Sequence, residues 1–256
     1  GTTAHYVGKQ LGKGYSVAWL CGLSWMLSEP MLREFNLFHA PQALTLLMPL
    51  YLLALIKWLE KPSNHTAIAC GGLLGVNAMI YWYYGFFLIL ISGPLILFRR
   101  HRSSLTIGLI SAVIALPGLY YFVSGQSILL EPSALIPGVD QLSHWFVPDR
   151  SNRISIVLLI GAVFSVRKTP YGLYWLGVIV FAYTLSSGGI VWETIQSLHP
   201  IFERLHWPVR WSVLIPLVSL PLLCRLPHAR YWLTAFIILT RILWNRGVQR
   251  YSGFGG

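Results

Sequence analysis

The sequence predicts an all-α, polytopic transmembrane protein. Hydrophobic residues (AVILMFWYC) make up 55% of the 256-residue chain, whereas Asp, Glu, Lys and Arg make up 11%. A soluble globular protein carries about 25% charged residues, so this chain has too few to cover a water-facing surface. Its mean hydropathy is +0.61, and apolar runs near the length of a membrane span recur along it. These observations exclude a soluble enzyme, a disordered chain and a secreted disulfide scaffold.

The first half of the chain predicts a leading helix fragment and five spans. Residues 1–13 form the fragment, which closes at Lys9 and Lys13. The apolar run over residues 66–98 would make a helix about 50 Å long, too long for a membrane core of about 30 Å. We expect a break at 81–85, where the aromatic cluster suits the membrane interface and Gly85 suits a turn. The spans are then about 15–28, 40–56, the two halves of 66–98, and 104–123 with a kink at Pro117.

The second half predicts four more spans, which makes about nine in a single domain over residues 1–256. Arg167 and Lys168 separate the first two of these spans, and a polar turn over 225–230 separates the last two. The spans are about 154–166, 171–187, 209–224 and 231–245. The longer polar connections are about 29–39, 124–153 and 188–208.

The charged residues set the orientation of these spans. With the Lys9 end in the cytoplasm, most basic residues fall in short cytoplasmic loops, as the positive-inside rule requires. The net charge of +11 therefore predicts contact with anionic membrane lipids and no nucleic-acid partner. Seven of the eight acids then fall in the three long connections, which become the outer loops. The outer acids are Glu29, Glu34, Glu131, Asp140, Asp149, Glu193 and Glu203.

The first outer loop carries the candidate acid–base residues Glu34, His39 and Glu29. A carboxylate in a desolvated site can act as a general base, because desolvation raises its pKa toward neutrality. The alternative is an interfacial loop with solvated charges.

A second group, Arg204, His206 and Arg210, lies just before a late span. Arg can bind phosphate oxygens in a bidentate way, so a lipid-linked phosphate is the predicted partner. The alternative is contact with ordinary headgroups, with Trp207 and Trp211 as membrane-belt residues.

The sequence predicts no cofactor. Asp140 and His144 are spaced to share a helix face and could hold a divalent cation, but two ligands make a poor site and Pro148 disfavours a helix there. The chain has no Walker loop, no dinucleotide-binding glycine pattern and no nucleophile elbow. Cys21, Cys70 and Cys224 lack metal or redox spacing and are interpreted as buried small residues.

Several short motifs together resemble bacterial membrane proteins of the GT-C glycosyltransferase superfamily. The resemblance covers most of the chain, and its motifs consist of residues common in membrane proteins. The matching segments are Leu27-Ser28-Glu29-Pro30, His39, Pro49-Leu50-Tyr51-Leu52-Leu53-Ala54-Leu55, Lys57-Trp58-Leu59-Glu60-Lys61, Tyr83-Tyr84-Gly85-Phe86-Phe87, Pro200-Ile201-Phe202 and Leu205-His206-Trp207-Pro208-Val209-Arg210-Trp211. His206 stands where the family's pattern has its first Arg.

The resemblance implies sugar transfer from a polyprenyl-phosphate donor at the outer face of the bacterial inner membrane. It also implies a key acid in an earlier outer loop, which has no match here. The chain begins Gly1-Thr2-Thr3, without an initiator Met or signal peptide, and we expect it to start inside a longer protein. The alternative is a non-catalytic accessory subunit that packs against other membrane subunits. A transporter is third, because ionisable residues are scarce in the middle of the spans.

Overall fold

A computed structural model describes residues 1–12, 14–28, 31, 45–124, 160–161, 163–186, 194, 197 and 208–252. All regular secondary structure in these residues is helical, in agreement with the predicted all-α class. The named helices are α1 (Thr2–Leu11), α2 (Tyr15–Met26), α5 (Leu47–Glu60), α6 (Asn64–Ile80), α7 (Trp82–Arg99), α8 (Ser104–Ser124), η2 (Val166–Lys168), α11 (Gly172–Ser186), η3 (Pro208–Val213), α14 (Leu214–Leu223) and α15 (Ala229–Ser252).

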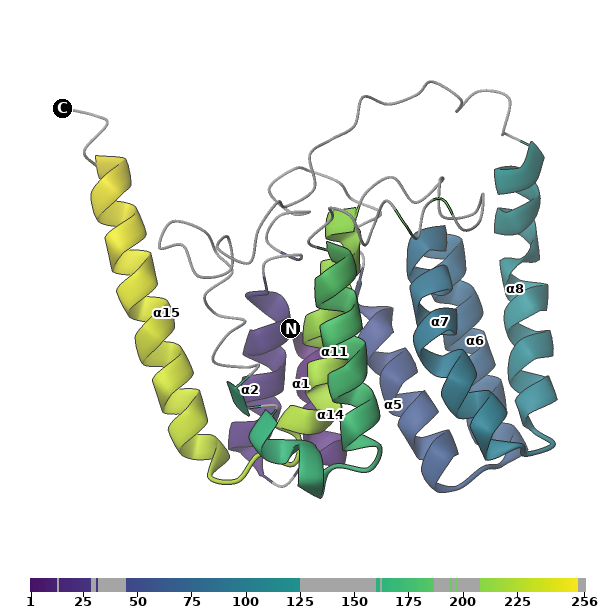
Figure 1. Ribbon diagram of the computed structural model, residues 1–256, viewed down its shortest axis with the longest axis horizontal. Coiled ribbons are helices and arrows are strands. Elements are labelled where there is room, and N and C mark those ends of the chain that lie inside the picture. The colour runs from purple at the N-terminus through teal and green to yellow at the C-terminus, as the bar shows by residue number, and fades with distance from the viewer. Residues whose placement is uncertain are drawn as a thin grey trace.

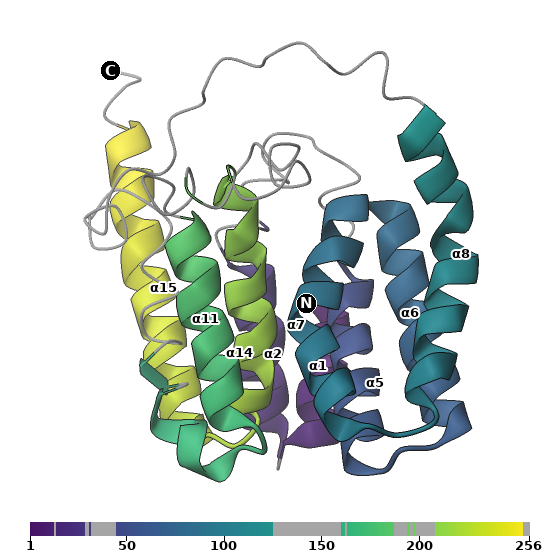
Figure 2. The same ribbon diagram turned by 45° about the vertical axis from the view of Figure 1, so that its right-hand side comes forward.

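The helices stand side by side and alternate in direction along the chain (Figure 1). Helices α5 to α8 form one group and α2, α11, α14 and α15 another, with α1 beside α2 and α5 (Figure 2). One continuous core of buried side chains runs through both groups. This arrangement is an antiparallel bundle, in which short turns join α1 to α2, the consecutive helices from α5 to α8, and α14 to α15.

The predicted break in the long apolar run is confirmed at Tyr81. Its backbone is extended, with φ −157° and ψ 109°, and it caps both α6 and α7. Gly85 does not lie in the turn as predicted, but inside α7. A Cβ atom added there would collide with Ala78 of α6, so the missing side chain allows the two helices to approach closely.

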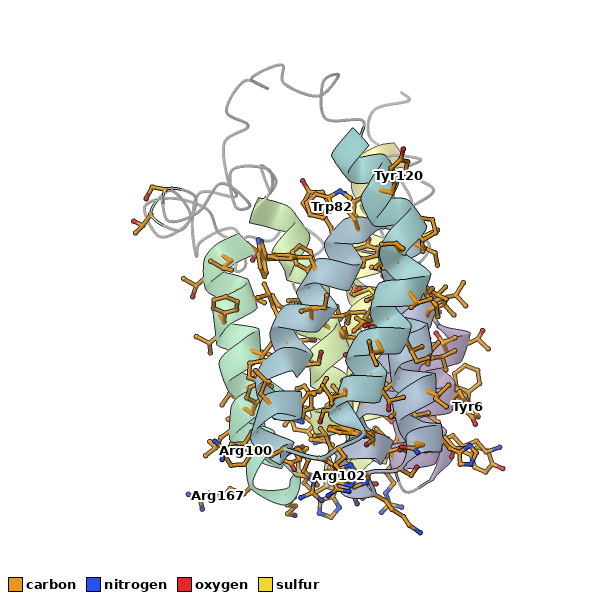
Figure 3. The ribbon with its side chains drawn as sticks, turned by 90° about the vertical axis from the view of Figure 1, so that its right-hand side faces the viewer. Tyr6, Trp82, Arg100, Arg102, Tyr120 and Arg167 are labelled. Carbon is orange, nitrogen blue, oxygen red and sulfur yellow. The ribbon has the colours of Figure 1, made fainter. Side chains whose placement is uncertain are left out.

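The described basic side chains of the predicted cytoplasmic loops lie at one end of the bundle, the basic end. Figure 3 shows Arg100, Arg102 and Arg167 there, with Trp82 and Tyr120 at the other end. We call that other end the outer end. The remaining basic residues of the group lie at helix termini or turns of the basic end: Lys9, Lys57, Lys61, Arg99, Lys168, Arg225 and Arg230.

Within the described residues, α7 is the one helix both long and apolar enough to cross a membrane, with a mean hydropathy of 1.4. Shorter apolar helices cover Ser104–Gly118, Gly172–Ser186, Trp211–Leu223 and Ala229–Leu239. Where the structure describes them, the predicted runs lie in helices, whereas most of the run 154–166 is outside the described residues and the nine membrane crossings remain a prediction.

Helix α8 leaves a continuous apolar face uncovered. The side chains of this face are between 60% and 76% exposed and recur every three or four residues. The opposite side of α8 packs on α6. An uncovered aliphatic face of this length suits lipid or another membrane protein rather than water. Its members are Leu105, Leu109, Val113, Leu116 and Tyr120.

Candidate functional site

The predicted site residues belong to segments that leave the outer end of the bundle. Residues Glu29, Glu34, His39, Arg204 and His206 lie outside the described residues, as do Asp140 and His144. The backbone of Arg210 is described and belongs to η3, whereas its side chain is not. The site is therefore built here from the described residues that flank these positions.

Two contacts anchor the ends of the segment that carries Glu34 and His39. The Thr45 hydroxyl, which is buried, donates a hydrogen bond to Sδ of Met31 at 2.7 Å. The Ser28 hydroxyl donates to the carbonyl oxygen of Trp25 at 2.9 Å and extends the end of α2. Both ends of the first outer loop are thus attached to the same end of the bundle.

Trp211 anchors the second predicted group at this end. Its side chain is fully buried, and its ring centroid lies 4.4 Å from that of Phe87, 5.8 Å from Phe181 and 6.4 Å from Phe86. These rings come from α7 and α11, so they hold η3, and with it the backbone of Arg210, against the first turns of α7. The interpretation of Trp211 as a membrane-belt residue is wrong, because the bundle encloses its ring.

The aromatic cluster at the start of α7 extends this packed region. Tyr81 contacts Tyr83 and Tyr84 at centroid distances of 5.2 and 4.9 Å, and Tyr83 reaches Phe87 at 6.1 Å. Tyr83 and Tyr84 are buried, although the sequence places them at the membrane interface. The start of α7 is therefore packed inside the bundle and meets η3 through Phe86 and Phe87, whereas its depth in a membrane remains a prediction.

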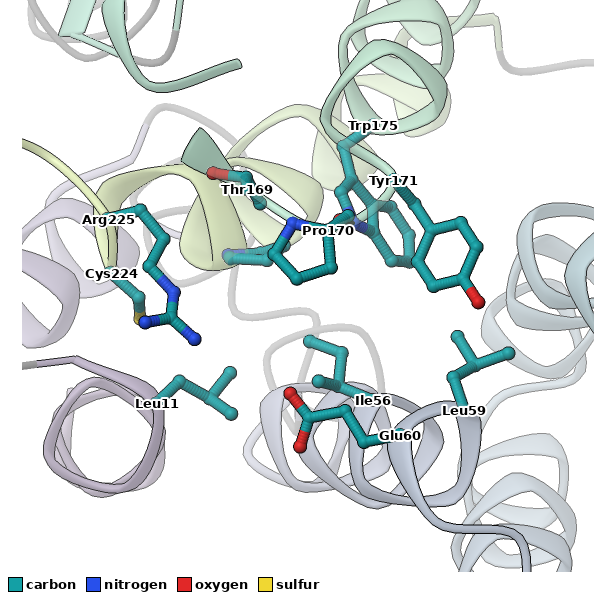
Figure 4. Close-up of a pocket in the computed structure, with 11 residues that line it drawn as sticks. Leu11, Ile56, Leu59, Glu60, Thr169, Pro170, Tyr171, Trp175, Cys224 and Arg225 are labelled. Atoms are coloured by element: carbon teal, nitrogen blue, oxygen red, sulfur yellow. Dashed lines mark hydrogen bonds between the residues drawn. The ribbon is translucent and has the colours of Figure 1, made fainter. Parts of the chain in front are cut away.

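The basic end carries a narrow crevice that the sequence does not predict. It is partly open to solvent, and the space within reach of water-sized molecules is about 30 Å³. Its lining includes Glu60 of α5 and, from the turn that follows α14, Cys224 and Arg225 (Figure 4). Glu60 is the one carboxylate among the described residues. It is also the one acid on the predicted cytoplasmic side, and this isolation is the sequence signal that could have indicated the crevice. The complete lining is Leu11, Ile56, Leu59, Glu60, Thr169, Pro170, Tyr171, Trp175, Pro221, Cys224 and Arg225.

In the described part of the chain, no three His, Cys, Asp or Glu residues lie close enough together to hold a metal ion. The chain matches no protein-family model, no curated protein and no solved structure. Functional interpretation therefore rests on the residues themselves.

Proposed function

We propose that this chain is a multi-pass membrane protein of the GT-C glycosyltransferase type. It transfers a sugar from a polyprenyl-phosphate donor at the outer face of a bacterial inner membrane. The observation that carries the proposal is the joint anchoring of two segments at the outer end. Buried Trp211 holds the backbone of Arg210 there, and the contact between Thr45 and Met31 joins the described flanks of the stretch whose sequence contains Glu34 and His39.

The membrane location is supported by three features of the described residues. Helix α7 is long and apolar enough to span, α8 exposes a continuous apolar face, and basic side chains gather at one end. In the proposed orientation the basic end faces the cytoplasm and its anionic lipids. The outer end, to which the predicted topology assigns most of the acids, then faces the opposite side of the membrane.

In the proposed reaction, an outer carboxylate takes the proton of the acceptor hydroxyl. The best candidate is Glu34, with Glu29 behind it and His39 as a second acid–base group. The hydroxyl oxygen bonds to the sugar's anomeric carbon as the bond from that carbon to the lipid phosphate breaks. Arg204, Arg210 and His206 stabilise the leaving phosphate. The earlier acid that the family resemblance implies has no match among residues 1–256, so the proposed reaction assigns proton transfer to the three residues named above.

The test is binding of polyprenyl phosphate by the chain in lipid nanodiscs. Replacing Arg210 with Ala removes a charge-assisted, bidentate contact, so we expect Kd to rise by about 10- to 100-fold. Arg102→Ala, at the basic end, is the matched control and should leave Kd unchanged. An unaltered Kd for Arg210→Ala, or an equal loss in both variants, would show that the phosphate does not bind at this group.

A second candidate, an accessory membrane subunit, is favoured by the exposed apolar face of α8. In a subunit this face is covered by another chain, whereas in an enzyme it contacts lipid. The binding test separates the enzyme from the accessory subunit, since a purely structural subunit has no affinity for polyprenyl phosphate. Absence of binding to the unmutated chain would therefore favour the subunit.

A further inference from the structure

Two of the three cysteines meet inside the bundle near the basic end. Cys21 lies in α2 and Cys224 caps the end of α14, 203 positions later in the chain. Their sulfur atoms are 3.8 Å apart and both side chains are buried. This spacing is van der Waals contact between two thiols, and both are free.

We propose that Cys21 and Cys224 form a reversible disulfide that locks α2 to α14 when a peroxide reaches the basic end. The third cysteine, Cys70, belongs to α6 and takes no part. The inference does not depend on the proposed glycosyltransferase activity, and it would hold equally in an accessory subunit.

The crevice at the basic end gives a small oxidant a route to the pair. Cys224 lies in its wall beside Arg225, whereas Cys21 is fully enclosed (Figure 4). A peroxide is close in size to water and fits the crevice. The first oxidation therefore falls on Cys224, and Cys21 is positioned to resolve it.

The chemistry balances with peroxide as the named oxidant. The Cys224 sulfur attacks one peroxide oxygen, the O–O bond breaks, and Cys224 sulfenic acid and one water form. The Cys21 sulfur then attacks the Cys224 sulfur, an S–S bond forms as the S–O bond breaks, and the hydroxyl leaves with the thiol proton as a second water. Two thiols are oxidised by two electrons in total, and one peroxide is reduced.

The two sulfur atoms have to move to form the bridge. A disulfide needs its sulfurs at about 2.05 Å, so the two atoms must approach by roughly 1.8 Å. Gly8 of α1 packs so closely on Cys21 that a Cβ atom there would lie 3.1 Å from Sγ of Cys21. Helix α1 therefore closes off one side of Cys21, which leaves Cys224 as the sulfur that lies against the crevice.

The bridge would hold two distant parts of the chain together. Helix α14 turns directly into α15, which packs on α2, so the bond closes a small unit of α2, α14 and α15. In the proposed orientation this end faces the reducing cytoplasm, so the resting pair is reduced. Oxidative stress would then fix one wall of the crevice.

The experiment treats the full chain in lipid nanodiscs with hydrogen peroxide, alkylates the remaining thiols and maps peptides without reduction. We expect a peptide joining Cys21 to Cys224, about 2 Da lighter than the two separate thiol peptides, that disappears with dithiothreitol. The treatment is run both at neutral pH and at about pH 8.5, because the thiolate is the nucleophile in this chemistry. Cys70→Ser should retain the bridge, whereas Cys21→Ser should leave Cys224 over-oxidised.

The unmutated chain decides the proposal, so a variant that fails to fold does not affect the result. A bridge that includes Cys70 would overturn it. So would over-oxidation of Cys224 in the unmutated chain without any bridge, or two unreacted thiols after treatment at the higher pH.

Discussion

Tyr51 shows how single polar side chains join the helices inside the bundle. Its hydroxyl is fully buried in α5 and donates to the Ser92 hydroxyl of α7 at 2.6 Å, and Ser92 donates in turn to the carbonyl oxygen of Leu88. Nearby, the Tyr174 hydroxyl of α11 donates to the carbonyl oxygen of Ile91 at 2.6 Å. Because buried polar atoms are costly when unpaired, these bonds fix how α5 and α11 sit against α7.

Replacing Tyr51 with Phe keeps the ring and removes the hydroxyl. Ser92 still donates to Leu88, so the change is confined to the contacts of the Tyr51 hydroxyl with Ser92 and with the Cys70 thiol, and we expect the free energy of unfolding to fall by about 1 kcal/mol. Unfolding of the detergent-solubilised chain by a denaturing detergent measures the change. Tyr15→Phe, at a ring 74% exposed, is the control and should have little effect. An equal loss in both variants would contradict a role for the buried hydroxyl.

At the scale of elements, glycines set the distance between α6 and α8. A Cβ atom at Gly71 would lie 2.7 Å from the carbonyl oxygen of Ile107 and 3.0 Å from Cβ of Ile110, and one at Gly75 would lie 2.7 Å from Cβ of Ile114. Gly71 and Gly75 are four residues apart and therefore share a face of α6. This close approach of small residues is typical of packed membrane helices.

Gly71→Ala should push α8 away from α6, since the clash is partly with backbone that cannot rotate aside. We expect a loss of about 1–3 kcal/mol in the free energy of unfolding. Gly72→Ala is a matched control on the next position of the same helix, where an added Cβ meets nothing within 4 Å. There alanine should stabilise by up to about 1 kcal/mol through its higher helix propensity. If both variants changed the free energy of unfolding in the same direction, the close packing of α6 on α8 at Gly71 would be refuted.

At the scale of the whole molecule, the described loop cations gather at one end of the bundle. All connections from α5 to α6, α7 to α8 and α14 to α15 turn at the basic end. Left-handed backbone at Arg100 and His228, with φ of 47° and 54°, lies in the second and third of these turns. Short basic loops are those to which the positive-inside rule applies.

Single cysteines in a chain without its native cysteines test this orientation. Arg102→Cys should react with a membrane-impermeant maleimide only in inverted membrane vesicles. Asp140→Cys, in the predicted loop 124–153, should react in intact spheroplasts. If both positions are labelled from the same side, they lie on the same side of the membrane. The predicted single span between them would then be wrong.

Much of the fold could be predicted because its signals are local. Apolar runs predicted the helices, and the length limit on one run predicted the break at Tyr81. The packing around the site was harder to predict from the sequence. The burial of Trp211 and the crevice around Glu60 depend on contacts between helices that lie far apart in the chain, and hydropathy does not specify which helix faces which. The position of Gly85 against Ala78 depends on how α7 folds back on α6 at Tyr81.

The amino-acid sequence is sufficient to establish an all-helical, strongly apolar chain with its cationic turns separated from most of its acids. Each of these properties depends on residues within one helix or one turn. The contact of Cys21 with Cys224 and the aromatic packing around Trp211 required the folded bundle. The physical reason is that van der Waals and hydrogen-bond contacts act over a few ångströms, so they exist only after lateral packing has brought distant segments together.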